Sequence, residues 1–390
     1  MKKSIKLFST IIAASILTGC NSSTTPSDTT SKEEIVYKYE EDQMYQKIWT
    51  GNVIYNESCL LVKDTNTGKI SARLLYKPTR IISVRDYTLE KEYKADEYVI
   101  EDDYLVATDK STMPFLTDKN VACTDMTGIE GIIGTYPAKN GNILFTEGTG
   151  IVMHHVFVTY EHEDSWFGTT PIEQGNKLPR LQQKLNNQEQ IKMVVNGDSI
   201  FTGCNSSGKL GIKPFQDDFP TGFANEITRK YGSEVVLHNT AVGGQVSNWG
   251  MLNVQNNVNM YDPDLVIIGF GMNDGCDAFQ VKPNDYVEHI KTMIDSIQYN
   301  CTSADIIVCA TIVANPDSTQ NYLQRDYLQP LKDMAEEYDD VVIMDMTTFS
   351  DDLLTKKKSL DLYANNINHP SDFMVRCYVQ NLMTTIEDKK

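Results

Sequence analysis

Four short polar segments in the second half of the chain contain residue types that could carry out acyl transfer. They are residues 196–200, 239–244, 269–274 and 366–370, which include Ser199, Gly244, Asn273 and His369. A serine hydroxyl is a weak nucleophile until a nearby base takes its proton, and histidine titrates close enough to neutral pH to be that base. We therefore predict that Ser199 is a nucleophile and that His369 is its general base.

Gly244 and Asn273 are predicted to stabilise the negative charge of the reaction. A glycine lets a backbone N–H approach a substrate closely, and the Asn273 amide can donate a second hydrogen bond to a developing oxyanion. Each such donor typically lowers the barrier by about 3 kcal/mol.

Two aromatic residues stand next to these donors in the sequence. Trp249 follows Gly244, and Phe270 precedes Gly271. We expect the two rings either to line a sugar or acyl pocket or to lie in the hydrophobic core, and the sequence leaves both places open.

Strand-like and helical patterns alternate from about residue 181 onward. The apolar runs are residues 191–195, 235–237, 265–270, 305–310 and 341–344. Five buried strands with helices between them predict a parallel sheet that is covered on both faces. The first three polar segments follow the first three runs, at the strand ends where such sheets bind ligands.

The preceding part of the chain has a different pattern. Residues 33–175 contain short alternating runs separated by turn signals, which is typical of an all-β sandwich. We therefore predict an N-terminal β-domain over residues 33–175 and an α/β domain over residues 185–390.

The first residues read as a targeting segment. Residues 1–19 combine a lysine-rich start, an apolar stretch and a Leu-Thr-Gly sequence before Cys20. This resembles a bacterial lipoprotein signal peptide, which implies that Cys20 carries a lipid and that residues 20–32 form a flexible tether. We expect an extracellular protein anchored to the cell membrane or outer membrane; an ordinary secretory signal is the alternative.

Charge and cysteine content exclude other classes of function. The chain has 35 basic and 53 acidic residues, a net charge of −18, which disfavours nucleic-acid binding. The seven cysteines after Cys20 are odd in number and scattered, which argues against a disulfide framework. No CxxC or HExxH motif occurs in the sequence, so zinc chemistry has little support.

Together, the four segments resemble the motif blocks of the SGNH (GDSL-type) hydrolases over residues 188–390. The resemblance implies a flavodoxin-like three-layer α/β/α domain that needs neither a metal nor an organic cofactor. It also implies that Ser199 and His369 are catalytic, and that the backbone N–H groups of Ser199 and Gly244 form an oxyanion hole with the Asn273 side chain.

One position departs from the family pattern. Asn366 stands three residues before His369, where the family usually has Asp. An amide cannot supply negative charge to the imidazole, so we predict a Ser–His dyad in which Asn366 or its carbonyl orients His369. Asp361 and Asp372 are the alternative carboxylates.

The order of the domains resembles that of bacterial carbohydrate esterases in which a jelly-roll-like domain precedes the SGNH domain. This favours an esterase that removes acetyl or similar small acyl groups from polysaccharide or oligosaccharide. A lipase, lysophospholipase or thioesterase, and a polysaccharide O-acetyltransferase, would use the same acyl-enzyme. A surface binding module with a vestigial site is a further alternative.

Overall fold

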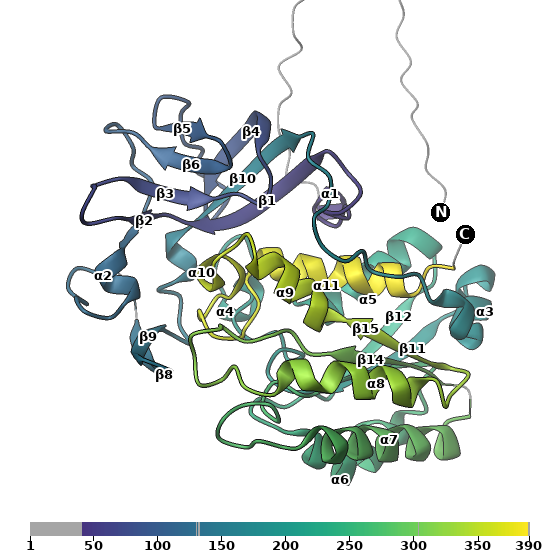
Figure 1. Ribbon diagram of the computed structural model, residues 1–390. Helices are drawn as coiled ribbons and strands as arrows, with labels where there is room; N and C mark the ends of the chain where they lie inside the picture. Colours follow the sequence, from purple (N-terminus) through teal and green to yellow (C-terminus); the bar gives the residue numbers. More distant parts are fainter. Residues whose placement is uncertain (1–40, 130, 132, 303, 389–390) are drawn as a thin grey trace, which may run out of the picture. The chain divides into compact units, whose positions relative to one another are not determined.

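The computed structural model describes residues 41–129, 131, 133–302 and 304–388 (Figure 1). The predicted signal peptide, Cys20 and the tether lie outside these residues, so their roles stay predictions. No helix in the described part of the chain combines the length and the apolar character needed to cross a membrane.

The C-terminal part contains a five-stranded parallel sheet in the order β12-β11-β13-β14-β15. Its strands are β11 (Ile191–Gly197), β12 (Val235–Asn239), β13 (Leu265–Gly269), β14 (Asp305–Ala310) and β15 (Val341–Asp345). The five predicted runs form these strands, and their order is that of flavodoxin-like folds, which confirms the predicted fold class.

Helices cover both faces of this sheet (Figure 1). Side chains alternate along each strand, so Val194 and Ile268 pack on one face and Met193 and Ile267 on the other. The first face is covered by α6 (Ser247–Asn257), α7 (Pro283–Asn300) and α8 (Leu328–Ala335). The second is covered by α3 (Pro179–Asn187), α5 (Phe219–Tyr231), α9 (Met346–Leu354) and α11 (Asp372–Thr385).

The last helix, α11, begins at Asp372. Ser371 caps α11 by accepting a hydrogen bond from the Met374 N–H, and Pro370 instead forms a bridge with Tyr363. This bridge closes the loop that carries His369 before the helix starts.

The N-terminal part is rich in sheet, as predicted. One antiparallel sheet contains β1 (Val53–Leu60), β10 (His155–His162) and β4 (Pro78–Asp86). A second sheet contains β5 (Tyr98–Glu101), β6 (Tyr104–Ala107), β3 (Ile70–Arg73), β2 (Val62–Lys63) and β7 (Leu116–Thr117). A separate hairpin consists of β8 (Gly134–Ala138) and β9 (Gly141–Phe145).

Short helical segments complete the described chain. They are α1 (Glu41–Met44), α2 (Asp118–Val121), α4 (Ser207–Leu210), α10 (Ser359–Leu362), and the 3-10 turns Val152–His154, Gly175–Lys177, Asn259–Tyr261 and Gln324–Tyr327.

The two parts share buried contacts. Lys357 Nζ lies 2.5 Å from the Glu57 Oε1 atom of β1, and both side chains are fully buried. The Tyr160 hydroxyl donates to the second Glu57 oxygen at 2.6 Å, and Asp361 Oδ1 accepts from the Leu60 N–H at 2.8 Å. Apolar residues of both parts also belong to one hydrophobic core. The β-rich part is therefore firmly fixed to the α/β part.

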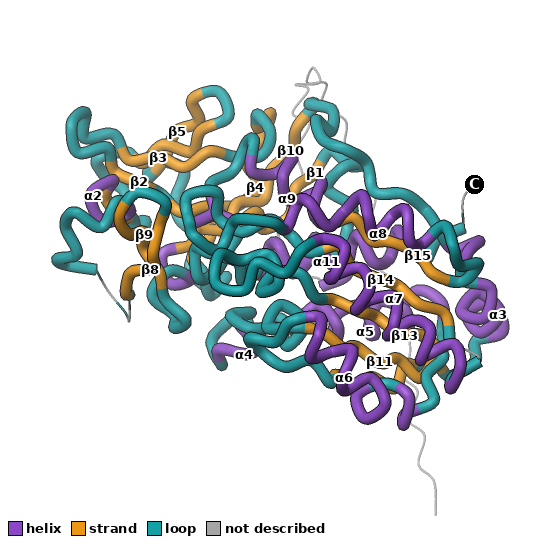
Figure 2. The backbone as a smooth tube through the Cα atoms, turned by 60° about the horizontal axis from the view of Figure 1, so that its bottom comes forward, coloured by secondary structure: helices purple, strands orange, loops and turns teal. Residues whose placement is uncertain are grey.

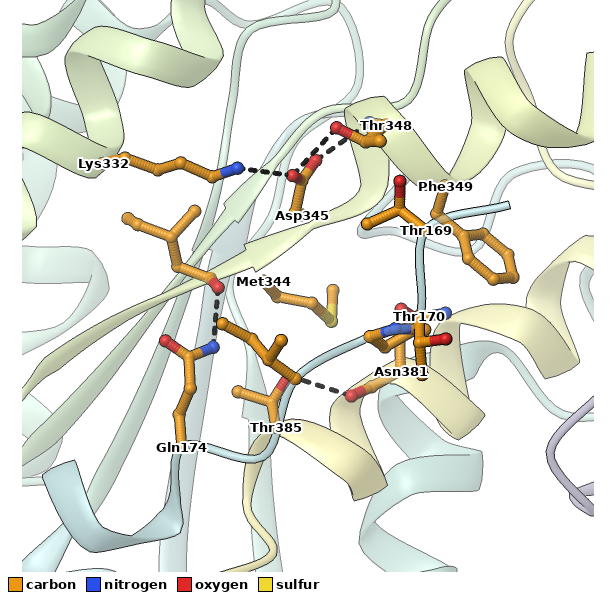
Figure 3. Close-up of a pocket in the computed structure, with 13 residues that line it drawn as sticks. Thr169, Thr170, Gln174, Lys332, Met344, Asp345, Thr348, Phe349, Asn381 and Thr385 are labelled. Carbon is orange, nitrogen blue, oxygen red and sulfur yellow. Dashed lines mark hydrogen bonds and ion pairs between the residues drawn. The ribbon is translucent and has the colours of Figure 1, made fainter. Parts of the chain in front are cut away.

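The connecting segment, residues 163–178, passes the edge strand β15. Gln174 Nε2 donates to the Ile343 carbonyl at 2.8 Å, which satisfies a backbone acceptor of that edge. A cavity of about 110 Å³ lies between this segment and the helices α9 and α11 (Figure 3). Its charged lining residues, Lys332 and Asp345, pair with each other at 2.7 Å, and Asp345 also caps α9. Both charged groups therefore have structural partners within the fold.

Candidate active site

Ser199 lies in the tight turn that follows β11. Gly197 ends this strand so close to β13 that a Cβ atom there would lie 2.5 Å from the Gly269 carbonyl oxygen. The Asp198 N–H donates to the same carbonyl, and Asp198 Oδ1 accepts from the Ile200 N–H at 3.0 Å. Burial raises the pKa of Asp198 to about 8. This turn fixes Ser199 beyond the carboxyl end of the strand.

His369 is held by its own loop with its ring against Ser199. Asn365 Oδ1 accepts hydrogen bonds from the backbone N–H groups of Ile367, Asn368 and His369 at 2.9–3.0 Å. The Nε2 atom of His369 lies 2.9 Å from Ser199 Oγ. This is the distance at which a general base takes the proton of a serine nucleophile.

The other ring nitrogen has two acceptors. His369 Nδ1 lies 2.6 Å from Asn205 Oδ1 and 3.0 Å from Glu147 Oε2. A proton on Nδ1 leaves Nε2 free to accept the serine proton, so these contacts favour the productive tautomer. Burial alone would raise the pKa of Glu147, but its hydrogen bond to His369, the imidazolium charge and a hydrogen bond from Asn365 lower it.

Three hydrogen-bond donors surround the space beside Ser199. Gly244 has φ +76°, a left-handed conformation that favours glycine. Within the described chain, the backbone N–H groups of Ser199 and Gly244 have no acceptor. Asn273 Nδ2 uses one N–H on the Gln245 carbonyl at 2.9 Å, which leaves its second N–H to donate elsewhere. These groups can receive an oxyanion.

A cavity of about 230 Å³ opens at this site. Its lining consists of Tyr136, Phe145, Glu147, Ser199, Gly244, Asn273, Gln320, Ile367, Asn368 and His369. Tyr136 and Phe145 come from the β8–β9 hairpin, and their ring centroids lie 5.3 Å apart. The β-rich part therefore supplies one wall of the cavity.

The hairpin is anchored to a loop of the α/β part. The Lys139 N–H donates to the Asp317 carbonyl at 2.9 Å, the Thr319 N–H to the Pro137 carbonyl at 3.2 Å, and Ala138 and Ser318 form a bridge. In Figure 2 the hairpin accordingly lies beside the loops at one end of the parallel sheet.

Comparison with known families assigns this part of the chain. Residues 195–374 match the family of GDSL-like lipases and acylhydrolases. They form a GDSL-type hydrolase domain. The resemblance found in the sequence motifs is thereby confirmed for this domain. No curated protein matches the sequence.

Several solved structures are similar to the chain. One is a two-domain esterase active on acetylated mannans, crystallised with mannopentaose, with 16% identity, a TM-score of 0.43, and coverage of 55% of this chain and 54% of its own. The similarity thus spans about half the length of that esterase. Another is an acetylxylan esterase from Geobacillus stearothermophilus, with 16% identity, a TM-score of 0.43, and coverage of 56% and 98%. A third is a putative GDSL-like lipase from Parabacteroides merdae, with 14% identity, a TM-score of 0.41, and coverage of 50% and 97%.

The predicted pocket role of two aromatic residues is wrong. Phe270 is only 1% exposed and packs in the core between the sheet and α6–α7. Trp249 is half-buried against the same core, and neither residue lines the cavity beside Ser199. Both rings belong to the hydrophobic core on the α6–α7 face of the sheet, which was the alternative for them.

The predicted orienting role of Asn366 is also wrong. Its Nδ2 atom donates to the Leu144 carbonyl at 2.8 Å, and both its oxygens accept from Asn315 Nδ2. Asp361 bonds the backbone of Leu60, and Asp372 bonds that of Ser207, so neither alternative carboxylate reaches His369.

Seven residues that the sequence analysis missed belong to the site, and three of them, Gln320, Ile367 and Asn368, come from the α/β part. Asn205 follows Ser199 by six positions but belongs to no motif, and Tyr136, Phe145 and Glu147 lie outside the GDSL-type domain. An acidic residue at the end of a strand with aromatic neighbours was the available signal for Glu147. Among the described residues, no group of three or more His, Cys, Asp or Glu side chains is arranged to hold a metal.

Proposed function

We propose that this chain is an extracellular serine esterase that removes acetyl or similarly small acyl groups from O-acylated carbohydrate. The observation that carries the proposal is the 2.9 Å contact between His369 Nε2 and Ser199 Oγ, beside the donors at Gly244 and Asn273. Nucleophile, base and oxyanion donors around one cavity are the parts that acyl transfer requires.

The reaction proceeds through two acyl transfers. Ser199 Oγ attacks the ester carbon while His369 Nε2 takes its proton, and the carbonyl oxygen becomes an oxyanion bound by the Ser199, Gly244 and Asn273 N–H groups. When this intermediate collapses, the bond between the ester carbon and the sugar oxygen breaks. The sugar oxygen takes the proton from His369 and leaves as a hydroxyl group. Water then gives a proton to His369 and attacks the acyl-serine, which releases the carboxylic acid and restores Ser199.

The cavity lining supports a carbohydrate substrate with a short acyl group. Among the described residues that line the cavity, Ile367 is the only apolar side chain besides Tyr136 and Phe145, and apart from Gly244 the others have polar side chains. Aromatic rings offer flat apolar surface to the C–H faces of a sugar, while Gln320 and Asn368 offer hydrogen bonds to hydroxyl groups. A long acyl chain would require a larger apolar surface.

Release of acetate tests this proposal. The chain starting at Asn21, which contains every described element, is incubated with acetylated xylan, acetylated mannan, 4-nitrophenyl acetate and a C12 ester. Acetate release from a polysaccharide that vanishes in Ser199→Ala supports the carbohydrate esterase. Hydrolysis of only the C12 ester would move the assignment to lipid substrates, and inactivity on all four would contradict the proposal.

We also propose that Cys20 carries a lipid that anchors the enzyme at the cell surface. The Leu-Thr-Gly-Cys sequence supports this. The full chain is expected in the membrane fraction of a bacterial host, and Cys20→Ser is expected to lose lipid labelling. Equal labelling of both proteins would contradict the anchor.

A further inference from the structure

The imidazole of His369 has one carboxylate close to it. Glu147 Oε2 lies 3.0 Å from Nδ1, and no other carboxylate in the described chain lies within 4.0 Å of the ring nitrogens. Position 366, where the family usually has Asp, holds an amide that points elsewhere. The charge that stabilises an imidazolium is therefore absent from the GDSL-type domain and present in the β-rich part.

We propose that Glu147 is the positioning residue that supplies this charge, so that the catalytic base is completed by the β-rich part. The inference rests on the proposed roles of Ser199 and His369. In this arrangement Asn205 Oδ1, at 2.6 Å, fixes the tautomer of the ring as a neutral acceptor. Glu147 adds the negative charge that favours the imidazolium formed when Ser199 attacks.

Three asparagines of the α/β part hold Glu147 in place. Asn366 binds the Leu144 carbonyl of β9, and Asn205 Nδ2 donates to the Glu147 backbone carbonyl at 2.9 Å. Asn365 Nδ2 lies 3.3 Å from Glu147 Oε1. The strand, the backbone and the carboxylate are thus each tied to the loops that carry Ser199 and His369. This is the support that a residue acting through its orientation requires.

Three other titratable groups near the Glu147–His369 pair are neutral at pH 7. Burial raises the pKa of the Cys204 thiol, and burial raises the pKa of the Tyr136 phenol. The buried Asp198 carboxyl has a pKa of about 8, also raised by burial. Glu147 itself is ionised because its pKa is lowered. Its side chain is 54% exposed, so solvent weakens its effect and we expect a moderate contribution.

Glu147→Gln tests the charge with little change of shape. On 4-nitrophenyl acetate we expect kcat to fall about tenfold with KM changed less than twofold, since the charge acts mainly on the transition state. The acid limb of the pH profile of kcat/KM should move to lower pH, because the protonated imidazole loses its carboxylate. Glu147→Asp keeps the negative charge on a side chain that is shorter by one methylene group. Its kcat should therefore lie between those of the wild type and Glu147→Gln. Glu163→Gln removes an exposed carboxylate of the connecting segment and should match the wild type.

A second readout does not depend on turnover. Titration of the His369 Cε1–H signal by NMR, assigned with His369→Asn, should show a lower midpoint in Glu147→Gln than in the wild type, because the imidazolium loses an adjacent negative charge. Unchanged kcat and an unchanged midpoint in Glu147→Gln would overturn the inference while wild-type hydrolysis still supports the esterase. If the wild type is inactive on every ester, the proposed function fails, and the NMR midpoint still decides whether Glu147 acts on His369.

Discussion

The side-chain amide of Asn366 donates a hydrogen bond of 2.8 Å to the backbone carbonyl of Leu144. Leu144 lies in β9, three residues before Glu147, so Asn366 connects the GDSL-type domain to the strand that precedes the carboxylate beside His369. Asn366 has φ +66°, a left-handed conformation that asparagine tolerates better than most residues. Asn366, at the position where the family usually has Asp, thus supports the site by binding the backbone of Leu144.

Replacing Asn366 by Asp should therefore not improve the enzyme. An aspartate at this position would place an oxygen against the Leu144 carbonyl and remove the donor, which should lower the free energy of unfolding by about 1–3 kcal/mol. We expect kcat to stay equal or fall, because the new carboxylate points away from His369. Urea denaturation and steady-state kinetics measure both effects, and a higher kcat in Asn366→Asp would contradict the observed orientation.

Asn273 should contribute strongly to the rate. Asn273→Ala removes a donor to the oxyanion, and we expect kcat on 4-nitrophenyl acetate to fall by roughly 10²–10³ with little change in KM. Asn225→Ala removes an exposed amide of α5 that does not line the cavity, and it is the control that should keep the wild-type rate. A loss below threefold in Asn273→Ala would exclude Asn273 from the oxyanion hole.

Asp198 should make stability depend on pH. Burial raises its pKa from 3.8 to about 8 in the folded protein, so the folded state keeps a proton that the unfolded chain loses near pH 4. Its contribution to the free energy of unfolding is therefore fully present below about pH 4 and is lost as the pH rises toward 8. Asp198→Asn should lose less stability between pH 5 and pH 8 than the wild type does. Urea denaturation at both pH values measures this, with Ser199→Ala as a control that should behave like the wild type; equal losses in all three proteins would contradict it.

Lys357 should be essential for stability. Lys357→Met leaves Glu57 buried without its counter-charge, and we expect a loss of about 3–5 kcal/mol in the free energy of unfolding. Lys358→Met alters the exposed neighbouring lysine and should change stability by less than about 0.5 kcal/mol. Chemical denaturation of both variants checks the prediction. Equally small losses of unfolding free energy in both would mean that water reaches Glu57 and solvates its charge.

The sequence predicted the α/β part well because periodicity reports burial directly. Runs such as residues 265–270 are short, rich in β-branched residues and bounded by turn residues, which favours strands covered on both faces, and chain connectivity then brings their carboxyl ends to one edge. Ser199 and His369 follow from this arrangement, and the structure brings them within 2.9 Å. Their chemical roles stay predictions that the kinetic tests address.

The contribution of the β-rich part could not be read from the sequence. Glu147 reaches His369 only because the hairpin bonds the loop around Asp317 and because Asn366 holds β9. These are tertiary contacts between residues more than 170 positions apart, which no local pattern encodes. The pocket role of Phe270 was wrong for a related reason. A position next to a motif glycine in the sequence does not determine which face of the sheet the ring packs against.

The buried Glu57–Lys357 pair and the common hydrophobic core have a consequence for how such a protein can evolve. A recombination event that moved residues 195–374 alone into another gene would separate Lys357 from Glu57, expose apolar side chains and leave His369 without Glu147. The β-rich and α/β parts must therefore be inherited together, and substitutions at their junction are expected to be accepted in compensating pairs.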